Sequence, residues 1–140
     1  MSNDMHEFNQ KAIKEFRENK GKVGGMFATT PLLLLNSVGA RSGHTRTNPL
    51  AYVKDGDHFV IIASKGGAPS HPDWYHNILA NPDVTVEVDD QKFRAKAHAI
   101  KEGAERDRLY AKMVAKNPGF ADYEKATTRK IPAVSLTRVK

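Results

Sequence analysis

Cysteine is absent from this 140-residue chain, which excludes disulfide bonds, thiolate nucleophiles and sulfur-ligated metals. Long apolar runs are also absent: the leucine run at positions 32–35, for example, is far short of the roughly 20 residues that cross a bilayer. The N-terminal residues lack the basic and then apolar order of a secretory signal. These absences make the cytoplasm the expected compartment.

Most motifs of self-contained catalysis are missing as well. No G-x-G-x-x-G follows a strand-like segment, and neither a P-loop nor the G-x-S-x-G pattern of serine hydrolases occurs. His71 and His76 are five residues apart, which predicts that they lie on different sides of a helix and form no metal site. A bound organic cofactor is therefore the favoured source of any chemistry.

The chain has a formal net charge of +6, with 22 lysines and arginines against 16 acidic residues. This excess favours an anionic partner such as a phosphorylated ligand, a nucleic acid or an anionic lipid surface. The basic residues are dispersed, however, and a solvated surface explains such an excess equally well. No face that interleaves aromatic and basic residues is recognisable, so a nucleic-acid partner is not expected.

The length and composition fit a single soluble domain, since hydrophobic residues make up 39% and charged residues 27% of the chain. We expect an N-terminal amphipathic helix with a linker over residues 1–24 and one folded domain over 25–140. Apolar side chains recur at helical spacing in 4–20, and glycines at 21, 24 and 25 end this helix. Such a helix either covers one side of a barrel, the commoner role in soluble proteins, or lies on a membrane surface.

Short strand-like segments with turn signals between them dominate the rest of the chain. The pattern predicts about six strands, at Leu32–Val38, Thr47–Lys54, His58–Ala63, Val84–Val88, Phe93–Ile100 and within 131–139. Turn residues at 55–57 and 89–91 predict two hairpins. Helices are expected at 72–80 and 102–116, with a short helix or ordered loop at 119–127. Consecutive hairpins favour an antiparallel sheet closed into a small barrel, which is an α+β fold that is mainly β.

The segment GARSGHTRTNPL, residues 39–50, combines turn glycines with side chains that bind anions. Gly39 and Gly43 permit a tight turn with exposed backbone N–H groups. Arg41 offers a planar fork for phosphate or carboxylate, and Arg46 can project to the same side from the next strand. The segment predicts either an anion-binding turn or a polar hairpin turn whose arginines are solvated.

The segment IIASKGGAPSHPDWYHN, residues 61–77, joins a strand end to a helix-like run that carries the only tryptophan. Its two glycines would let the backbone approach a flat ligand, and Lys65 adds positive charge. Trp74 is expected to pack in the core. Phe120 and Tyr123 are three residues apart and share one face of a helical turn, where the phenol lines a pocket, donates a proton or simply packs.

In their order along the chain, these motifs resemble those of the deazaflavin-dependent nitroreductase family. The shared features are a G-x-[RK]-[ST]-G-x-x-R-x-x-P-L turn, an ASKGG strand end, a P-x-W-Y-x-N run and a late DY…T-x-R-x-IP segment. The resemblance covers residues 25 to 138, nearly the whole predicted domain. Members of that family are small split β-barrel proteins, related to FMN-binding proteins, that use the reduced 8-hydroxy-5-deazaflavin coenzyme F420.

The resemblance implies roles for individual residues. The turn at 39–50 would hold the phosphate and acidic tail of the coenzyme, and the segment at 63–67 would line its ring. Ser64 and Tyr123 are the implied catalytic residues. The implied coenzyme-binding residues are Arg41, Ser42, Gly43, Arg46, Asn48, Pro49, Ala63, Ser64, Lys65, Gly66, Gly67, Trp74 and Asn77.

Two positions depart from the family pattern. Ala40 stands where relatives often have an arginine, which implies weaker or differently arranged binding of the tail. Phe120 stands where the nitroimidazole-reducing member has a second tyrosine, which argues against nitroimidazole activation. As acceptors, quinones and activated enones are at least as plausible as nitroimidazoles.

The implied reaction is hydride transfer from C5 of the reduced deazaflavin to a quinone, an activated enone or lactone, or a nitro compound. Ser64 and Lys65 would hydrogen-bond the ring, and Tyr123 would orient the acceptor or help to protonate it. Two alternatives stay open: an FMN-binding split-barrel oxidoreductase, and a carrier that holds the deazaflavin without catalysis. Both a monomer and a homodimer are compatible with the sequence.

Overall fold

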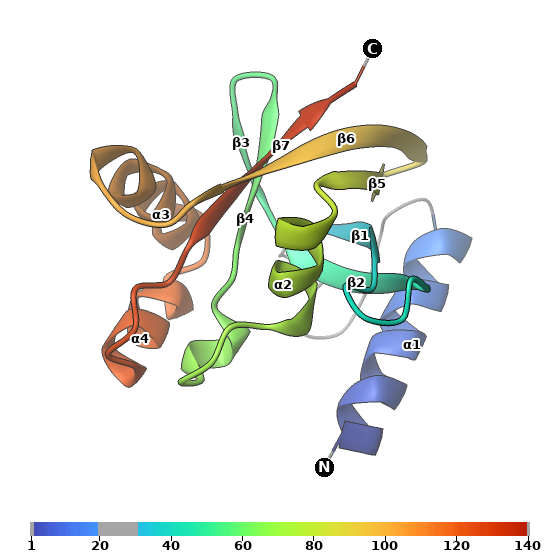
Figure 1. Ribbon diagram of the computed structural model, residues 1–140, viewed down its shortest axis with the longest axis horizontal. Helices are drawn as coiled ribbons and strands as arrows, with labels where there is room; N and C mark the ends of the chain where they lie inside the picture. The colour runs from blue at the N-terminus through green and yellow to red at the C-terminus, as the bar shows by residue number, and fades with distance from the viewer. Residues whose placement is uncertain (1, 20–30, 140) are drawn as a thin grey trace.

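A single seven-stranded sheet dominates the computed structural model, which describes residues 2–19 and 31–139. Its strands follow the order β2-β1-β5-β6-β7-β4-β3 and pair antiparallel. The sheet curls into a half-barrel (Figure 1), which confirms the predicted mainly-β fold. The strands are β1 (Leu32–Val38), β2 (Thr45–Ala51), β3 (Val53–Asp55), β4 (His58–Ile62), β5 (Asp83–Val88), β6 (Gln91–Ile100) and β7 (Ala133–Arg138).

Four α-helices and a short 3₁₀ turn surround this sheet in the described part of the chain. They are α1 (Ser2–Glu18), η2 (Lys65–Gly67), α2 (Asp73–Ala80), α3 (Ala104–Lys116) and α4 (Gly119–Ala126). Figure 1 shows α3 and α4 together at one end of the sheet and α1 at the other. None of the helices described is long and apolar enough to cross a bilayer. The glycines at 21, 24 and 25, and the expected boundary between 24 and 25, lie outside the described residues.

The segment predicted as one strand at 47–54 forms two strands on opposite edges of the sheet. β2 pairs with β1, whereas β3 pairs with β4, and Tyr52 alone separates the two. Because β2 and β3 end the strand order, this short connection brings the two edges of the curled sheet together. The sheet therefore has seven strands where about six were predicted. The extra strand was missed because no turn residue marks the boundary between β2 and β3 in the sequence.

Both predicted hairpins are confirmed. In the first, Asp55 lies opposite His58, and Gly56 takes the left-handed conformation with φ of 61°. In the second, Val88 lies opposite Gln91, and the turn places Asp89 at φ 54°. Both turns use residue types that tolerate positive φ at little cost, as the sequence signals required.

The four leucines of β1 are buried on both faces of the sheet. Leu33 and Leu35 join the main core, which also contains Trp74 and Tyr75 of α2. Leu32 and Leu34 instead pack with Ile13 and Phe16 of α1. Ile13 and Phe16 of α1 are thus covered by the sheet, which is the covering role considered for this helix.

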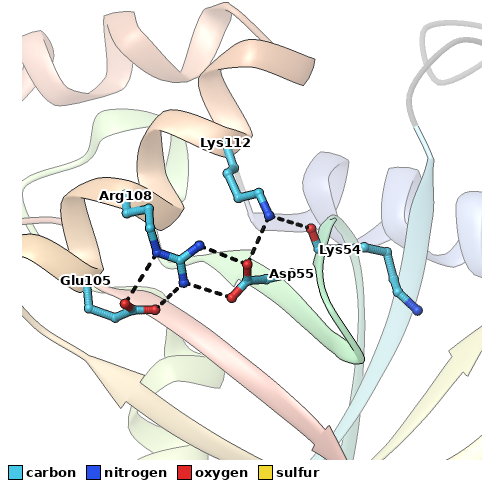
Figure 2. Close-up of polar contacts among 5 residues, drawn as sticks. All are labelled: Lys54, Asp55, Glu105, Arg108 and Lys112. Atoms are coloured by element: carbon cyan, nitrogen blue, oxygen red, sulfur yellow. Dashed lines mark hydrogen bonds and ion pairs between the residues drawn. The ribbon is translucent and has the colours of Figure 1, made fainter.

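Ion pairs fasten the helices at each end of the sheet. Arg17 on α1 binds Glu87 on β5 through two bonds, Nε to Oε1 at 3.1 Å and Nη2 to Oε2 at 2.8 Å. At the opposite end, α3 is joined to the β3–β4 hairpin by Asp55, whose carboxylate accepts from Arg108 and Lys112, each at 2.9 Å (Figure 2). The network in Figure 2 is solvent-accessible, whereas Glu87 is only 9% exposed.

Candidate functional site

A polar groove of about 1110 Å³ lies between α1, the turn that follows β1, and the first residues of α2. Predicted coenzyme-binding residues line it: Arg41, Ser42, Arg46, Asn48, Trp74 and Asn77. The rest of the lining was not among the predicted coenzyme-binding residues, although four of its members lie in the predicted turn segment 39–50. It comes from α1 (Asn9, Gln10, Ile13, Arg17), from the turn and β2 (Gly39, Ala40, Thr45, Thr47) and from α2 (Asp73, His76).

The turn at 39–44 is tight, as its glycines predicted. The Gly39 N–H donates to the His44 carbonyl at 2.8 Å, and the Gly43 N–H donates to the Gly39 carbonyl at 3.0 Å. A Cβ at Gly39 would lie 2.6 Å from the Ser42 hydroxyl oxygen, and Gly43 has a φ of 73°. This backbone leaves the side chains of Arg41 and Ser42 exposed at the groove.

Asn77 of α2 holds this turn in place. Its Oδ1 accepts a hydrogen bond from the Ala40 N–H at 2.9 Å, although the two residues lie 37 positions apart. Asn77 is 9% exposed, so an unpaired amide oxygen there would be costly. Trp74, one turn earlier on the same helix, is 5% exposed and also lines the groove. It therefore packs in the core and borders the candidate site, and the two roles considered for it are compatible.

A partly buried hydrogen-bond network lies beside the groove, whose lining includes Thr47 and Arg17. Thr47 donates from Oγ1 to Asn36 Oδ1 at 2.6 Å, and Asn36 donates from Nδ2 to Glu87 Oε2 at 2.9 Å. Burial alone would raise the pKa of Glu87, but the hydrogen bonds from Arg17 and Asn36 outweigh it and leave that pKa lowered. Because Arg17 is engaged with this carboxylate, Arg41 and Arg46 are the arginines of the lining that remain for an anionic ligand.

The segment after β4 forms a second part of the candidate site. Ala63 and Ser64 are buried, while Lys65 is exposed and has a φ of 48°. Gly67 is buried, with a φ of 85°, and a Cβ there would lie 2.8 Å from the Ala126 Cβ and 3.1 Å from the Tyr123 carbonyl. The close approach that requires Gly67 is thus made by α4, a partner that the sequence did not indicate.

Arg129, in the connection between α4 and β7, binds this segment through all three guanidinium nitrogens. Nη2 donates to the carbonyls of Ser64 at 2.9 Å and Ala63 at 3.2 Å, and Nε donates to the Ala68 carbonyl at 2.9 Å. Nη1 lies 2.9 Å from Nδ1 of His71. Arg129 stands in the TTRKIP segment that contributed to the resemblance, but nothing local in the sequence assigned its partners.

His71 and His76 lie closer together than predicted. Their ring centroids are 5.9 Å apart, and the His71 ring also lies 4.8 Å from that of Tyr75. The prediction of different helix sides was wrong because His71 precedes the first turn of α2 and is not on the helix. Across the described residues, no group of histidine and acidic side chains could hold a metal ion.

Tyr123 lies on α4 beside the second part of the site. Its ring is 4.9 Å from that of Phe120, so the two share a face as predicted, and its side chain is half-buried. Neither Tyr123 nor residues 63–67 belong to the lining of the groove, and the same holds for Gly43 and Pro49. The predicted residues thus fall into two groups, one made of the turn with Trp74 and Asn77 of α2, and the other of residues 63–67 with Tyr123 of α4.

Comparisons with known proteins agree on one family. The family model described as F420H2-dependent quinone reductase matches residues 9–138. The chain belongs to the F420H2-dependent quinone reductase family. It is 38% identical over 126 residues to an F420H2-dependent quinone reductase of Mycobacterium tuberculosis, covering 88% of this chain and 85% of that protein.

Solved structures support the same assignment. A structure of an F420H2-dependent reductase is 37% identical, with a TM-score of 0.70, over 76% of this chain and 93% of that one. Another, described as a domain-swapped dimer, is 33% identical, with a TM-score of 0.71, over 97% and 99% of the two chains. The protein is therefore an oxidoreductase whose cofactor is reduced coenzyme F420.

The residues of the groove fit this cofactor. Its lining offers two arginines not engaged by Glu87, a hydroxyl on a tight turn and an asparagine, which is a donor set suited to phosphate and carboxylate. The buried wall formed by Trp74 gives the same groove an apolar side.

Proposed function

We propose that this protein oxidises reduced coenzyme F420 and reduces a quinone. The observation that carries the proposal is the convergence of Arg41 and Arg46 on one polar groove, beside a turn that Asn77 holds in place. Membership of the F420H2-dependent quinone reductase family supports the choice of acceptor, as does the name of the Mycobacterium tuberculosis relative.

The two groups of residues take different tasks in this proposal. When bound, the reduced deazaflavin supplies a hydride from its C5 carbon. Arg41, Ser42 and Arg46 bind the phosphate and the acidic tail through charge-assisted hydrogen bonds. Residues 63–67 lie beside the ring, where Ser64 donates a hydrogen bond and Lys65 stabilises negative charge. Tyr123 borders the acceptor.

The direct test is the oxidation of reduced F420 in the presence of a soluble quinone, followed by the absorbance of the oxidised coenzyme. We expect turnover well above the protein-free rate. Arg41→Ala should weaken coenzyme binding by about tenfold to a hundredfold, the value of a lost charge-assisted hydrogen bond. Arg94→Ala is the matched control, because Arg94 is an exposed arginine on β6 outside the groove.

The same assay separates the alternatives. Coenzyme binding without turnover on quinones, enones or nitro compounds would indicate a carrier. Tight binding of FMN without binding of F420 would overturn the proposal, and fluorescence quenching of each cofactor measures this directly. Nitroimidazoles belong in the acceptor panel because Phe120 replaces the tyrosine of the nitroimidazole-reducing member.

The proposal also covers the oligomeric state and the location of the protein. A homodimer is favoured over a monomer by the domain-swapped dimer of a relative that is 33% identical, and light scattering of the purified protein tests it. The cytoplasm remains the proposed location. Peripheral membrane contact through α1 has little support, since Ile13 and Phe16 are buried against the sheet.

A further inference from the structure

Among the described residues, the segment from Ala63 to His71 has few hydrogen bonds other than those to Arg129. Its Ala63 N–H donates to the Pro132 carbonyl at 3.0 Å, and Lys65 Nζ donates to Ser70 Oγ at 3.3 Å. The 3₁₀ turn of the segment has two backbone hydrogen bonds, from Gly67 N–H to the Ser64 carbonyl at 2.9 Å and from Ala68 N–H to the Lys65 carbonyl at 3.2 Å. Such turns are weak in isolation. Lys65 also takes a positive φ, which residues other than glycine adopt only when their surroundings impose it.

Arg129 adds a restraint from outside the segment. One planar guanidinium reaches the carbonyls of Ala63, Ser64 and Ala68 and the Nδ1 of His71. These acceptors bracket the turn, and the Ser64 carbonyl receives both the turn's own bond and a bond from Arg129. A rigid fork that binds both ends of a turn fixes its conformation, which a single ammonium group cannot do.

His71 extends this restraint to α2. Its Nδ1 accepts from Arg129 only when that nitrogen carries no proton. Its ring lies against Tyr75 of α2, the helix whose Asn77 holds the anion-binding turn. Arg129 therefore connects the segment proposed to line the ring with the helix that orders the phosphate end of the site.

We propose that Arg129 is a positioning residue that holds residues 63–71 in the conformation required for coenzyme binding, with His71 as the acceptor that orients it. This inference rests on the proposed placement of the coenzyme ring beside residues 63–67. Arg129 itself need not touch the coenzyme, because its nitrogens are engaged with the segment.

The test uses the full chain and the variants Arg129→Ala, Arg129→Lys and His71→Asn, with Arg94→Ala as control. Hydrogen exchange of the Gly67 and Ala68 amides, without coenzyme, reports on the segment alone. We expect Arg129→Ala to accelerate it by about tenfold or more, while amides of the β5–β6 hairpin stay unchanged. Arg129→Lys should be intermediate, and His71→Asn, which keeps an acceptor, should stay close to the wild type.

Coenzyme affinity is the second measurement. The dissociation constant for F420 should rise by about tenfold or more in Arg129→Ala, and Arg129→Lys should recover part of the loss. If Arg129→Ala does not fold, Arg129→Lys and His71→Ala still remove some of the hydrogen bonds between Arg129 and residues 63–71. Both variants should then show faster amide exchange and weaker F420 binding, with smaller changes than those expected for Arg129→Ala.

Two results would overturn the inference. The first is exchange and affinity within about twofold of wild type in both Arg129 variants. The second is loosening of the whole protein with unchanged affinity in the folded fraction, which would indicate a purely structural arginine. If the wild type itself fails to bind F420, the proposed function is wrong, and the exchange measurement still decides whether Arg129 holds the segment.

Discussion

The Oδ1 of Asn77 accepts a hydrogen bond from the Ala40 N–H at 2.9 Å, and this bond ties α2 to the turn that carries Arg41. Ala40 is one of the two positions identified from the sequence as departures from the family pattern. In this chain the backbone of that residue, rather than its side chain, is what shapes the turn. The phosphate end of the proposed site therefore depends on a residue of another element.

Replacing Asn77 by alanine should loosen the turn. We expect a loss of about 1 kcal/mol in the free energy of unfolding, the value of one hydrogen bond with a partly buried partner. The affinity for F420 should also fall, since Arg41 would no longer be held at the groove. Asn81→Ala, at an exposed position after the same helix, is the control. Unchanged F420 affinity in Asn77→Ala would show that the turn is stable without α2.

Replacing Glu87 by glutamine should destabilise the protein by about 1–2 kcal/mol, because Arg17 and Asn36 lose a charged acceptor. The pKa of Glu87 is lowered from 4.5 in the folded protein. The contribution of Glu87 to the free energy of unfolding is therefore fully present at a pH above its pKa in the unfolded chain. It is lost as the pH falls through its lower pKa in the folded protein. Glu87→Gln should flatten stability in this acid range, as measured by urea unfolding. Glu102→Gln, at an exposed site, should keep the wild-type profile.

The protonation of His71 should weaken the hold on residues 63–71. Burial lowers its pKa below 6.5, and the positive charges of Arg129, His76 and Lys101 lower it further, while Tyr75 faces its ring. The unfolded chain then binds this proton more readily, so stability falls as the pH drops below 6.5. Protection of the Gly67 amide should fall in the same range. His71→Asn should remove this dependence, and His98→Asn, on the exposed face of β6, should retain it.

Gly67 and Gly56 provide a matched pair of glycines at positive φ. A Cβ at Gly56 would have no atom within 4 Å, so Gly56→Ala should cost only the backbone strain of about 1–2 kcal/mol. Gly67→Ala adds a Cβ 2.8 Å from the Ala126 Cβ, and overpacking typically costs a further 1–3 kcal/mol or so. Urea unfolding of both variants measures the difference. Equal losses in the free energy of unfolding would mean that α4 shifts away from the new Cβ at position 67 without cost.

Tyr123→Phe tests the role of the phenol. Since solvent can supply a proton, we expect kcat to stay within about threefold of wild type and KM for the quinone to rise. A fall of about a hundredfold in kcat at unchanged KM would instead indicate a proton donor. Tyr52→Phe is the control, because Tyr52 packs against the main core and Tyr123 packs against a different apolar cluster.

The two site segments were recognisable in the sequence for different reasons. The turn at 39–44 depends on local backbone geometry, so Gly39 and Gly43 were enough to predict it. The glycines at 66 and 67 suggested the approach of a flat ligand, but Gly67 is needed because α4 packs against it. A glycine in a sequence can indicate that another group approaches the backbone closely, but it does not identify whether that group is a ligand or another element of the protein.

The sequence by itself determined the order of helices and strands, both hairpins and the turn that carries Arg41, because these follow from alternation, turn residues and spacing within a few positions. The tertiary structure alone decided that one strand-like run serves both edges of the sheet. It also decided that Arg17 meets Glu87 across 70 positions and that Arg129 meets Ser64 across 65. The curl of the sheet sets which distant residues meet, and a charged side chain carries no local mark of the partner it will find.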